Sequence, residues 1–113
     1  MDRMITIETA LNEAIVEFAK KRPHSAAMHK RACAVMPGGN TRTVLFTAPF
    51  PIRVEKGAGA TLTDVDGFVY ADFLGEYSAG IYGHSHPVLK QAVAQALEQG
   101  INLGGQHVGE VEF

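Results

Sequence analysis

The 113-residue chain is predicted to adopt an α+β fold, in which helices precede and follow a small antiparallel sheet. Three observations predict this class. Apolar residues recur at helical spacing before residue 37 and again after residue 86. Between them, β-forming segments flank an Asp-Gly pair, which is typical of a hairpin turn.

Two helices are expected in the first third of the chain. Residues 9–21 place apolar side chains on one face, and residues 22–24 interrupt that pattern. Ser25 is a candidate N-cap for a second helix, which ends at the Pro37-Gly38-Gly39 run. The apolar stripes are Leu11, Ile15, Phe18 and Ala19 in the first helix and Met28, Ala32, Val35 and Met36 in the second.

The middle of the chain predicts a sheet. Residues 52–55 alternate apolar and charged side chains, as in a short half-exposed strand. Residues 61–64 and 68–72 flank Val65-Asp66-Gly67 and predict a hairpin, while Gly57-Ala58-Gly59 is expected to be a turn between strands.

A third helix is predicted from Pro87 to Gly100, because proline suits the first helical position and glycine the C-terminal cap. Its expected buried stripe is Leu89, Val93, Ala96 and Leu97. Residues 109–113 resemble the first turn of a further helix, with Glu110 and Glu112 favouring the helix dipole. Five residues are too few for a stable helix, so we expect the sequence to be part of a longer protein.

Composition excludes several classes of protein. The chain is 46% hydrophobic and 19% charged, which is globular, and its net charge of −2 offers no basic footprint for nucleic acid. No run approaches the roughly 20 apolar residues of a membrane span, and the start lacks a signal-peptide pattern. The lone Cys33 is expected to be a small buried hydrophobe and suits a reducing compartment, so a cytoplasmic location is expected.

Arg42 stands out within Gly38-Gly39-Asn40-Thr41-Arg42-Thr43. A guanidinium can bind a carboxylate through two parallel hydrogen bonds, and the nearby glycines would let a small anion approach the backbone. An ordinary surface arginine beside a helix end explains the same residues.

The segment from Gly75 to Gly83 places Tyr77 and Tyr82 among three glycines. The two rings would suit a pocket wall with polar tips, and they would equally suit a tight loop that packs on the core.

Other sites find little support. His84-Ser85-His86 lacks further ligands at metal-binding spacing and is better explained by capping of the next helix. Asp64-Val65-Asp66-Gly67 does not fit the calcium-loop pattern, and no serine or cysteine has the context of a nucleophile. No metal site and no catalytic residue is expected in this chain.

The same motifs resemble the N-terminal part of class III (ω-type) aminotransferases, which use pyridoxal phosphate. The resemblance rests on MPGGNTR, the hairpin LTDVDGFVYADF, GIYGHSHP at the start of a helix, and GINLGG, and it covers residues 25–113. Within the class the sequence is most similar to β-amino acid transaminases of the β-phenylalanine type, with the glutamate-1-semialdehyde aminomutase branch nearby. The arginine directly after Asn40-Thr41 favours the β-amino acid branch.

This resemblance implies a type I pyridoxal-phosphate transferase fold, of which residues 25–113 would form a small-domain segment after an N-terminal helix and linker at 1–24. It implies a homodimer acting on small amino acid and 2-oxo acid substrates. Arg42 would bind the substrate carboxylate, with Val44, Tyr77, Glu76 and Tyr82 around it. The cofactor would be bound downstream, since Lys20, Lys21, Lys30, Lys56 and Lys90 match no cofactor-binding position, so this chain alone would be inactive.

Two alternatives remain open from the sequence. The parent protein could be a glutamate-1-semialdehyde 2,1-aminomutase, or this segment could be a non-catalytic fragment that serves only as a folding or dimerisation module.

Overall fold

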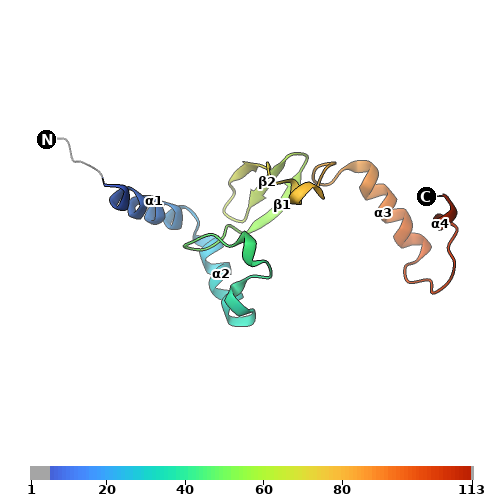
Figure 1. Ribbon diagram of the computed structural model, residues 1–113, viewed down its shortest axis with the longest axis horizontal. Helices are drawn as coiled ribbons and strands as arrows, with labels where there is room; N and C mark the ends of the chain where they lie inside the picture. Colours follow the sequence, from blue (N-terminus) through green and yellow to red (C-terminus); the bar gives the residue numbers. More distant parts are fainter. Residues whose placement is uncertain (1–5, 113) are drawn as a thin grey trace.

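The computed structural model describes residues 6–112, which form an elongated chain of helices on either side of a small sheet. The molecule measures 75 × 31 × 22 Å, and its radius of gyration is 20.5 Å. A compact domain of about 100 residues has a radius of gyration near 13 Å. The elements follow one another along the long axis, from α1 (Ile7–Lys21) at one end to α4 (Gly109–Glu112) at the other (Figure 1).

The first two helices meet near the sheet. α1 begins two residues before the expected start, because the Thr6 hydroxyl accepts a hydrogen bond from the Thr9 amide at 3.2 Å and caps the helix. α2 (Pro23–Val35) also begins earlier than expected, with proline in its first turn. The prediction that Ser25 is its N-cap is wrong: Ser25 lies inside the helix and is fully buried.

The cap of α2 comes from the hairpin instead. The two carboxylate oxygens of Asp66 accept the amides of His24 and Ser25 at 2.8 and 2.9 Å. These are two of the amides that a helix N-terminus leaves without an internal partner. Partial burial alone would raise the pKa of Asp66, but hydrogen bonds from Ser25 and the His24 amide outweigh it and lower the pKa.

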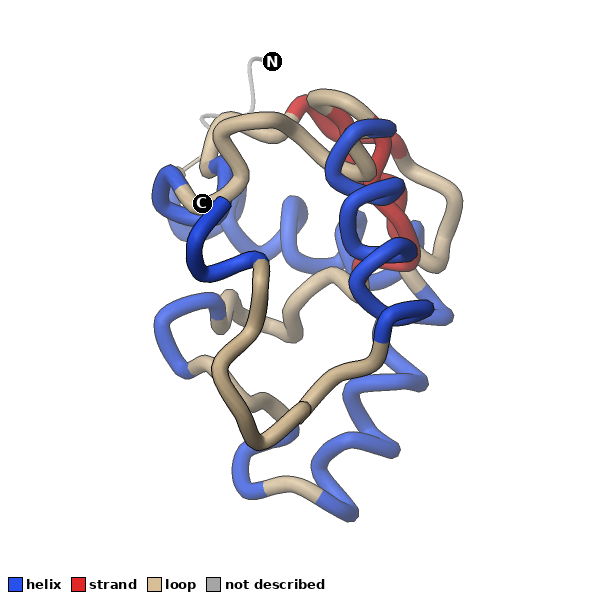
Figure 2. Tube along the Cα trace, turned by 90° about the vertical axis from the view of Figure 1, so that its right-hand side faces the viewer, coloured by secondary structure: helices blue, strands red, loops and turns tan. Residues whose placement is uncertain are grey.

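The sheet has three antiparallel strands in the order β1 (Val54–Ala58), β2 (Thr61–Asp64) and β3 (Val69–Ala71). The predicted hairpin around Gly67 is confirmed, with Thr61 opposite Ala71 and Thr63 opposite Val69. β1 starts two residues later than expected and continues through Gly57 and Ala58, so the turn falls at Gly59 and Ala60. The strands are a small share of a trace that is mainly helix and loop (Figure 2).

A buried acidic residue joins the hairpin to the first two helices. Asp64 is 1% exposed and accepts hydrogen bonds from the amides of Asp66 and Phe68 and from the Tyr70 hydroxyl. Arg22 donates to the same hydroxyl at 3.0 Å, and its guanidinium lies over the Phe18 and Phe68 rings at 4.4 and 4.5 Å. The hydrogen-bonded and stacked cation neutralises the buried carboxylate and fixes α1 against the sheet.

The later helices extend away from this joint. α3 (Pro87–Gln99) and its glycine cap at Gly100 (φ 98°) confirm the expected helix, and α4 confirms a short helix from Gly109. Phe113, the last residue of the predicted turn, lies outside the described residues. No helix within 6–112 is long and apolar enough to cross a membrane.

The apolar stripes predicted to be buried are largely uncovered. In α3, Val93 is 60% and Leu97 is 58% exposed, and α1 buries none of its residues. Cys33 is also exposed, so the expectation that it is a buried hydrophobe is wrong. Among the described residues, α1 is packed only near its C-terminal end, where Phe18 contacts Phe50 and Arg22, and no other helix or strand packs closely on α3.

Candidate functional site

Arg42 lies in a glycine-rich bend that follows α2. Two short 3₁₀ turns, η1 (Pro37–Gly39) and η2 (Thr43–Leu45), flank it. Gly38 and Gly39 adopt φ values of 65° and 67°, which the missing Cβ makes accessible. A Cβ on Gly39 would lie 2.7 Å from the Cys33 sulfur, so this glycine also permits close approach to α2.

The bend forms one wall of a shallow hollow of about 170 Å³. Both Arg42 and Arg53 line it, which gives the hollow a cationic character suited to a small anion. Its full lining is Asn40, Thr41, Arg42, Leu45, Phe46, Pro51, Ile52 and Arg53.

A second loop, residues 73–83, is closed at its base by Asp72 and His84. One Asp72 oxygen accepts the amides of Leu74 and Gly75 at 2.9 and 3.0 Å, and the other lies 2.7 Å from His84 Nε2. The Gly75 hydrogen bond, together with the His84 contact, lowers the pKa of Asp72. A carboxylate with these partners holds both ends of the loop together.

The middle of this loop has an unusual backbone. Glu76, Tyr77 and Ser78 have φ values of 51°, 54° and 77°, in the left-handed region that non-glycine residues rarely adopt. The Gly80 amide donates to the Gly75 carbonyl at 2.9 Å and closes the bend. Residues kept in such conformations concentrate at functional sites, where the surrounding structure imposes them.

An ion pair joins the two loops. Arg42 Nη1 donates to Glu76 Oε1, although the residues are 34 positions apart in the sequence. The side chains are 54% and 47% exposed, so the guanidinium is accessible to a ligand. Two of the residues predicted from the sequence are thus in direct contact.

The other predicted residues are near Arg42 in the chain or in the second loop, but they do not line the 170 Å³ hollow. Val44, on η2, is exposed, and so are Tyr77 and Tyr82. The Tyr82 ring packs edge-on against His86, with 5.8 Å between ring centroids. Within the described residues the structure therefore pairs Arg42 with Glu76 and leaves the apolar side chains open.

His84 anchors the second loop to the sheet. Its backbone forms a two-bond bridge with Gly59, at 3.0 and 2.8 Å. Its ring lies over Gly57, where a Cβ would come within 2.6 Å of the imidazole. His86 is the N-cap residue of α3, as expected for residues 84–86, although no side chain makes a capping hydrogen bond there. The loop-closing role of Asp72 and His84 was not anticipated, although both residues belong to motifs that the sequence singles out.

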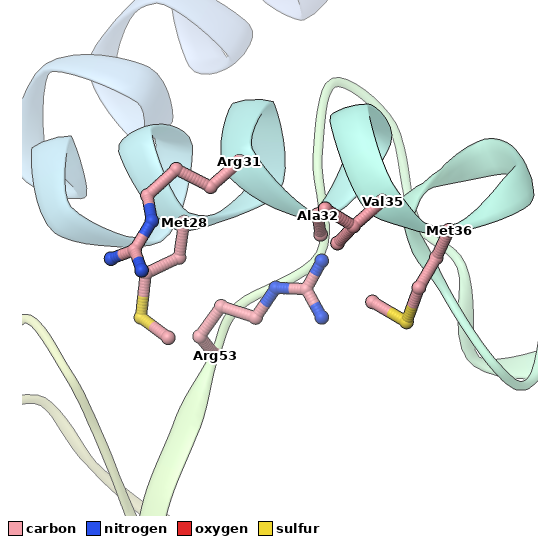
Figure 3. Close-up of a pocket in the computed structure, with 6 residues that line it drawn as sticks. All are labelled: Met28, Arg31, Ala32, Val35, Met36 and Arg53. Atoms are coloured by element: carbon pink, nitrogen blue, oxygen red, sulfur yellow. The ribbon is translucent and has the colours of Figure 1, made fainter.

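A larger hollow of about 310 Å³ lies on the other side of Arg53. The Arg53 guanidinium lies against α2 beside Ala32 and Val35, whereas Arg31 reaches toward Met28 (Figure 3). Arg53 Nη2 donates to the Gly39 carbonyl at 2.7 Å, and this hydrogen bond fixes the backbone of the bend that carries Arg42. The alternation pattern had suggested only a charged strand residue at this position.

Metal chemistry finds no site in the described part of the chain. Within residues 6–112, no three His, Cys, Asp or Glu side chains come together in a way that could hold an ion.

Comparison with known proteins identifies the family of this chain. Residues 46–109 match the family described as "Aminotransferase class-III". The chain is 46% identical over 104 residues to a beta-phenylalanine transaminase of Variovorax paradoxus, covering 92% of this chain and 24% of that protein. It is 48% identical over 108 residues to an uncharacterized aminotransferase of Schizosaccharomyces pombe, covering 95% of this chain and 25% of that protein.

Solved structures agree. The crystal structure of the Variovorax paradoxus beta-phenylalanine aminotransferase superposes with a TM-score of 0.87 at 46% identity, over 91% of this chain and 24% of that one. A transaminase with pyridoxal phosphate bound gives 0.76 at 44% identity, over 80% of this chain and 22% of that one.

The chain belongs to the class-III aminotransferase family, and its fold is part of the type I pyridoxal-phosphate transferase fold. It spans about a quarter of the length of the curated relatives it matches.

Pyridoxal phosphate is the cofactor that this family implies. Such enzymes hold it with a lysine amine and an acidic or basic partner for the pyridine nitrogen. No lysine of residues 6–112 lines the hollow beside Arg42. Lys90 lines a groove on α3 with Leu89, Val93 and Leu97; the other polar side chains of this groove are Ser85 and His86, and no carboxylate or arginine lines it for the pyridine nitrogen or phosphate. The described residues do not by themselves fit the cofactor.

Proposed function

We propose that the full-length protein transfers an amino group between a β-amino acid and a 2-oxo acid, and that Arg42 binds the substrate carboxylate. The observation that carries this proposal is the exposed Arg42 guanidinium at the edge of a hollow that Arg53 also lines. The similarity to beta-phenylalanine transaminase supports the choice of substrate class.

Arg42 suits a carboxylate for a chemical reason. Its planar fork can donate two parallel hydrogen bonds to the two carboxylate oxygens, which fixes the orientation of the substrate as well as its charge. The supporting hydrogen bond from Arg53 to Gly39 fixes the bend that carries Arg42. A substrate whose carboxylate is bound in this way has a fixed orientation, so its amino group and side chain point in defined directions.

Val44, Tyr77 and Tyr82 supply the apolar part of the same proposed site. All three are exposed in the described residues, and such rings and methyl groups form pocket walls once other segments cover them. We assign them to the side-chain pocket of the substrate. Glu76, predicted for the same wall, contacts Arg42 instead.

The cofactor and the quaternary structure also belong to the proposal. We propose that pyridoxal phosphate is bound by the remainder of the full-length enzyme and that the enzyme is a homodimer. The division of the chain into an N-terminal helix and linker at 1–24 and a small-domain segment at 25–113 stays a prediction, as does the cytoplasmic location.

A direct test of the reaction class uses the full-length holoenzyme with β-phenylalanine and 2-oxoglutarate. We expect β-phenylalanine to be converted to 3-oxo-3-phenylpropanoate, which loses carbon dioxide to give acetophenone, with one glutamate formed per amino group transferred. We expect no turnover without the acceptor. Turnover of a semialdehyde with no external acceptor would instead support the aminomutase alternative, which is favoured by 37% identity over 93 residues to a glutamate-1-semialdehyde 2,1-aminomutase of Methanocella arvoryzae.

The non-catalytic alternative is tested by the same assay on substituted holoenzymes. If Arg42→Ala and Tyr77→Ala each leave kcat and KM for β-phenylalanine unchanged, the segment serves folding or assembly alone. A loss of kcat/KM in either variant, with the protein still folded, removes that alternative.

A further inference from the structure

The carboxylate that faces Arg42 is part of the protein. Within the described residues, Glu76 is the acidic side chain that forms an ion pair with Arg42. The proposed substrate group and Glu76 are both carboxylates, so they would compete for the same guanidinium.

The structure holds Glu76 in this position. Its backbone is in the left-handed region, with φ 51° and ψ 43°. The loop that carries it is closed at its base by the Asp72–His84 contact and tied to the sheet by the His84–Gly59 bridge. An anchored loop of this kind keeps the Glu76 side chain within reach of Arg42 at little cost in conformational entropy.

We propose that Glu76 is an intramolecular competitor for the substrate carboxylate at Arg42, and thereby a specificity-determining residue. The inference rests on the proposed function of Arg42. An incoming substrate carboxylate displaces the Glu76 carboxylate from Arg42 and forms a new ion pair with the same guanidinium, so the charge of Arg42 stays neutralised. A neutral ligand cannot make this exchange and leaves the Arg42–Glu76 pair closed.

The size of the effect follows from the exposure of the pair. Ion pairs between exposed side chains are worth little, because water and salt screen them. Removing the competitor should therefore improve carboxylate binding by about two- to fivefold, and it should leave neutral ligands unaffected.

The experiment measures inhibition constants in the full-length holoenzyme. The probes are 3-phenylpropanoate, which carries the carboxylate without the amino group, and its neutral amide. The variants are Glu76→Gln, Arg42→Ala and the double substitution. Glu76→Asn is a second neutral replacement, because asparagine tolerates the left-handed backbone better than glutamine. Glu17→Gln is the matched control, since it removes an exposed Glu–Lys pair at 2.5 Å on α1, remote from the site.

We expect Glu76→Gln and Glu76→Asn to lower the inhibition constant of 3-phenylpropanoate by about two- to fivefold. The amide should be unaffected, and Glu17→Gln should change neither probe. In the Arg42→Ala background the gain should vanish, because the two carboxylates then have no shared partner.

Two results would overturn the inference. An unchanged constant in both Glu76 variants, with weakened binding in Arg42→Ala, would refute competition while leaving the role of Arg42 intact. A raised constant would mean that Glu76 positions the ligand. If Arg42→Ala itself leaves 3-phenylpropanoate binding unchanged, the proposed function fails first.

Discussion

At the scale of single residues, Asp72 has the most consequential set of contacts. Its carboxylate accepts two amides of the loop that it precedes and contacts the His84 ring that follows that loop. All three partners favour the ionised form, which is why the pKa of Asp72 is lowered, chiefly by the Gly75 hydrogen bond and next by His84. The negatively charged Asp72 carboxylate thus holds together the two ends of the loop that carries Glu76 and Tyr77.

The lowered pKa predicts how the loop responds to acid. An unperturbed aspartate has a pKa of about 3.9, and the folded value of Asp72 lies below it. The stabilisation is therefore fully present above about pH 4 and is lost as the pH falls through the folded pKa. Hydrogen exchange of residues 73–83 in the full-length protein should accelerate over that range, after correction for intrinsic rates. Asp72→Asn, which cannot ionise, should remove this step. A step that persists in the variant would assign it to another group.

The candidate site was predictable from the sequence only in part. Arg42 was singled out by its residue type and by the family resemblance, and Glu76 by the family resemblance alone. Their pairing was not, because 34 residues separate them and the contact depends on how the second loop folds back. Arg53 was overlooked, since its alternation pattern placed it on an exposed strand face while the structure directs it under the Arg42 bend.

At the scale of elements, the bridge between His84 and Gly59 joins the second loop to the sheet. Gly83 precedes it with a φ of 73°, and a Cβ there would lie 2.7 Å from the Gly59 carbonyl oxygen. Gly59 itself has a φ of 55°, but a Cβ at that position would meet open space. An alanine at either position would therefore bear the strain of a positive φ, but only an alanine at Gly83 would also clash with a neighbouring backbone atom.

Substituting these glycines tests the bridge. Gly83→Ala should lower the free energy of unfolding of the full-length protein by about 1–3 kcal/mol more than Gly59→Ala does. Both variants bear the strain of a positive φ, whereas only Gly83→Ala must move the backbone of the bridge. Urea denaturation followed by fluorescence measures the difference. Equal losses in the two variants would show that the bridge adapts freely.

The elements themselves were well predicted where the signal is local. The hairpin and α3 follow from an Asp-Gly turn, a proline and a glycine that lie within or beside them. The start of α2 was wrong because its cap, Asp66, is supplied by the hairpin about 40 residues later. Ser25 has the composition of a cap, but its hydroxyl accepts the Arg53 amide inside the structure.

At the scale of the whole molecule, the described chain exposes far more surface than a compact protein of its size. Its accessible surface is 9530 Å², against about 6,000 Å² expected for a folded monomer of this mass. Exposed apolar side chains line α1 and α3 as well as the loops, and the side chains fully removed from solvent are those of Asp64 and Ser25. The helix stripes were predictable from the sequence, whereas their exposure was not, because no described segment covers them.

This surface predicts the behaviour of residues 1–113 produced alone. We expect the isolated chain to bind the dye ANS strongly and to unfold without a cooperative transition, because its helices lack packing partners. The full-length protein at equal concentration is the control, and calorimetry with dye fluorescence makes the comparison. A sharp melting transition of the isolated chain with little dye binding would contradict the expectation.

The central claim is that Arg42 binds the substrate carboxylate. The most direct measurement is kcat/KM of the full-length holoenzyme and its Arg42→Ala variant with two amino donors, β-phenylalanine and 1-phenylethylamine, which lacks the carboxylate. A charged hydrogen-bonding partner is worth about 1.5–3 kcal/mol, so we predict a loss of roughly 10- to 100-fold for the β-amino acid and little change for the amine. Equal effects on both donors, or none on either, would contradict the claim.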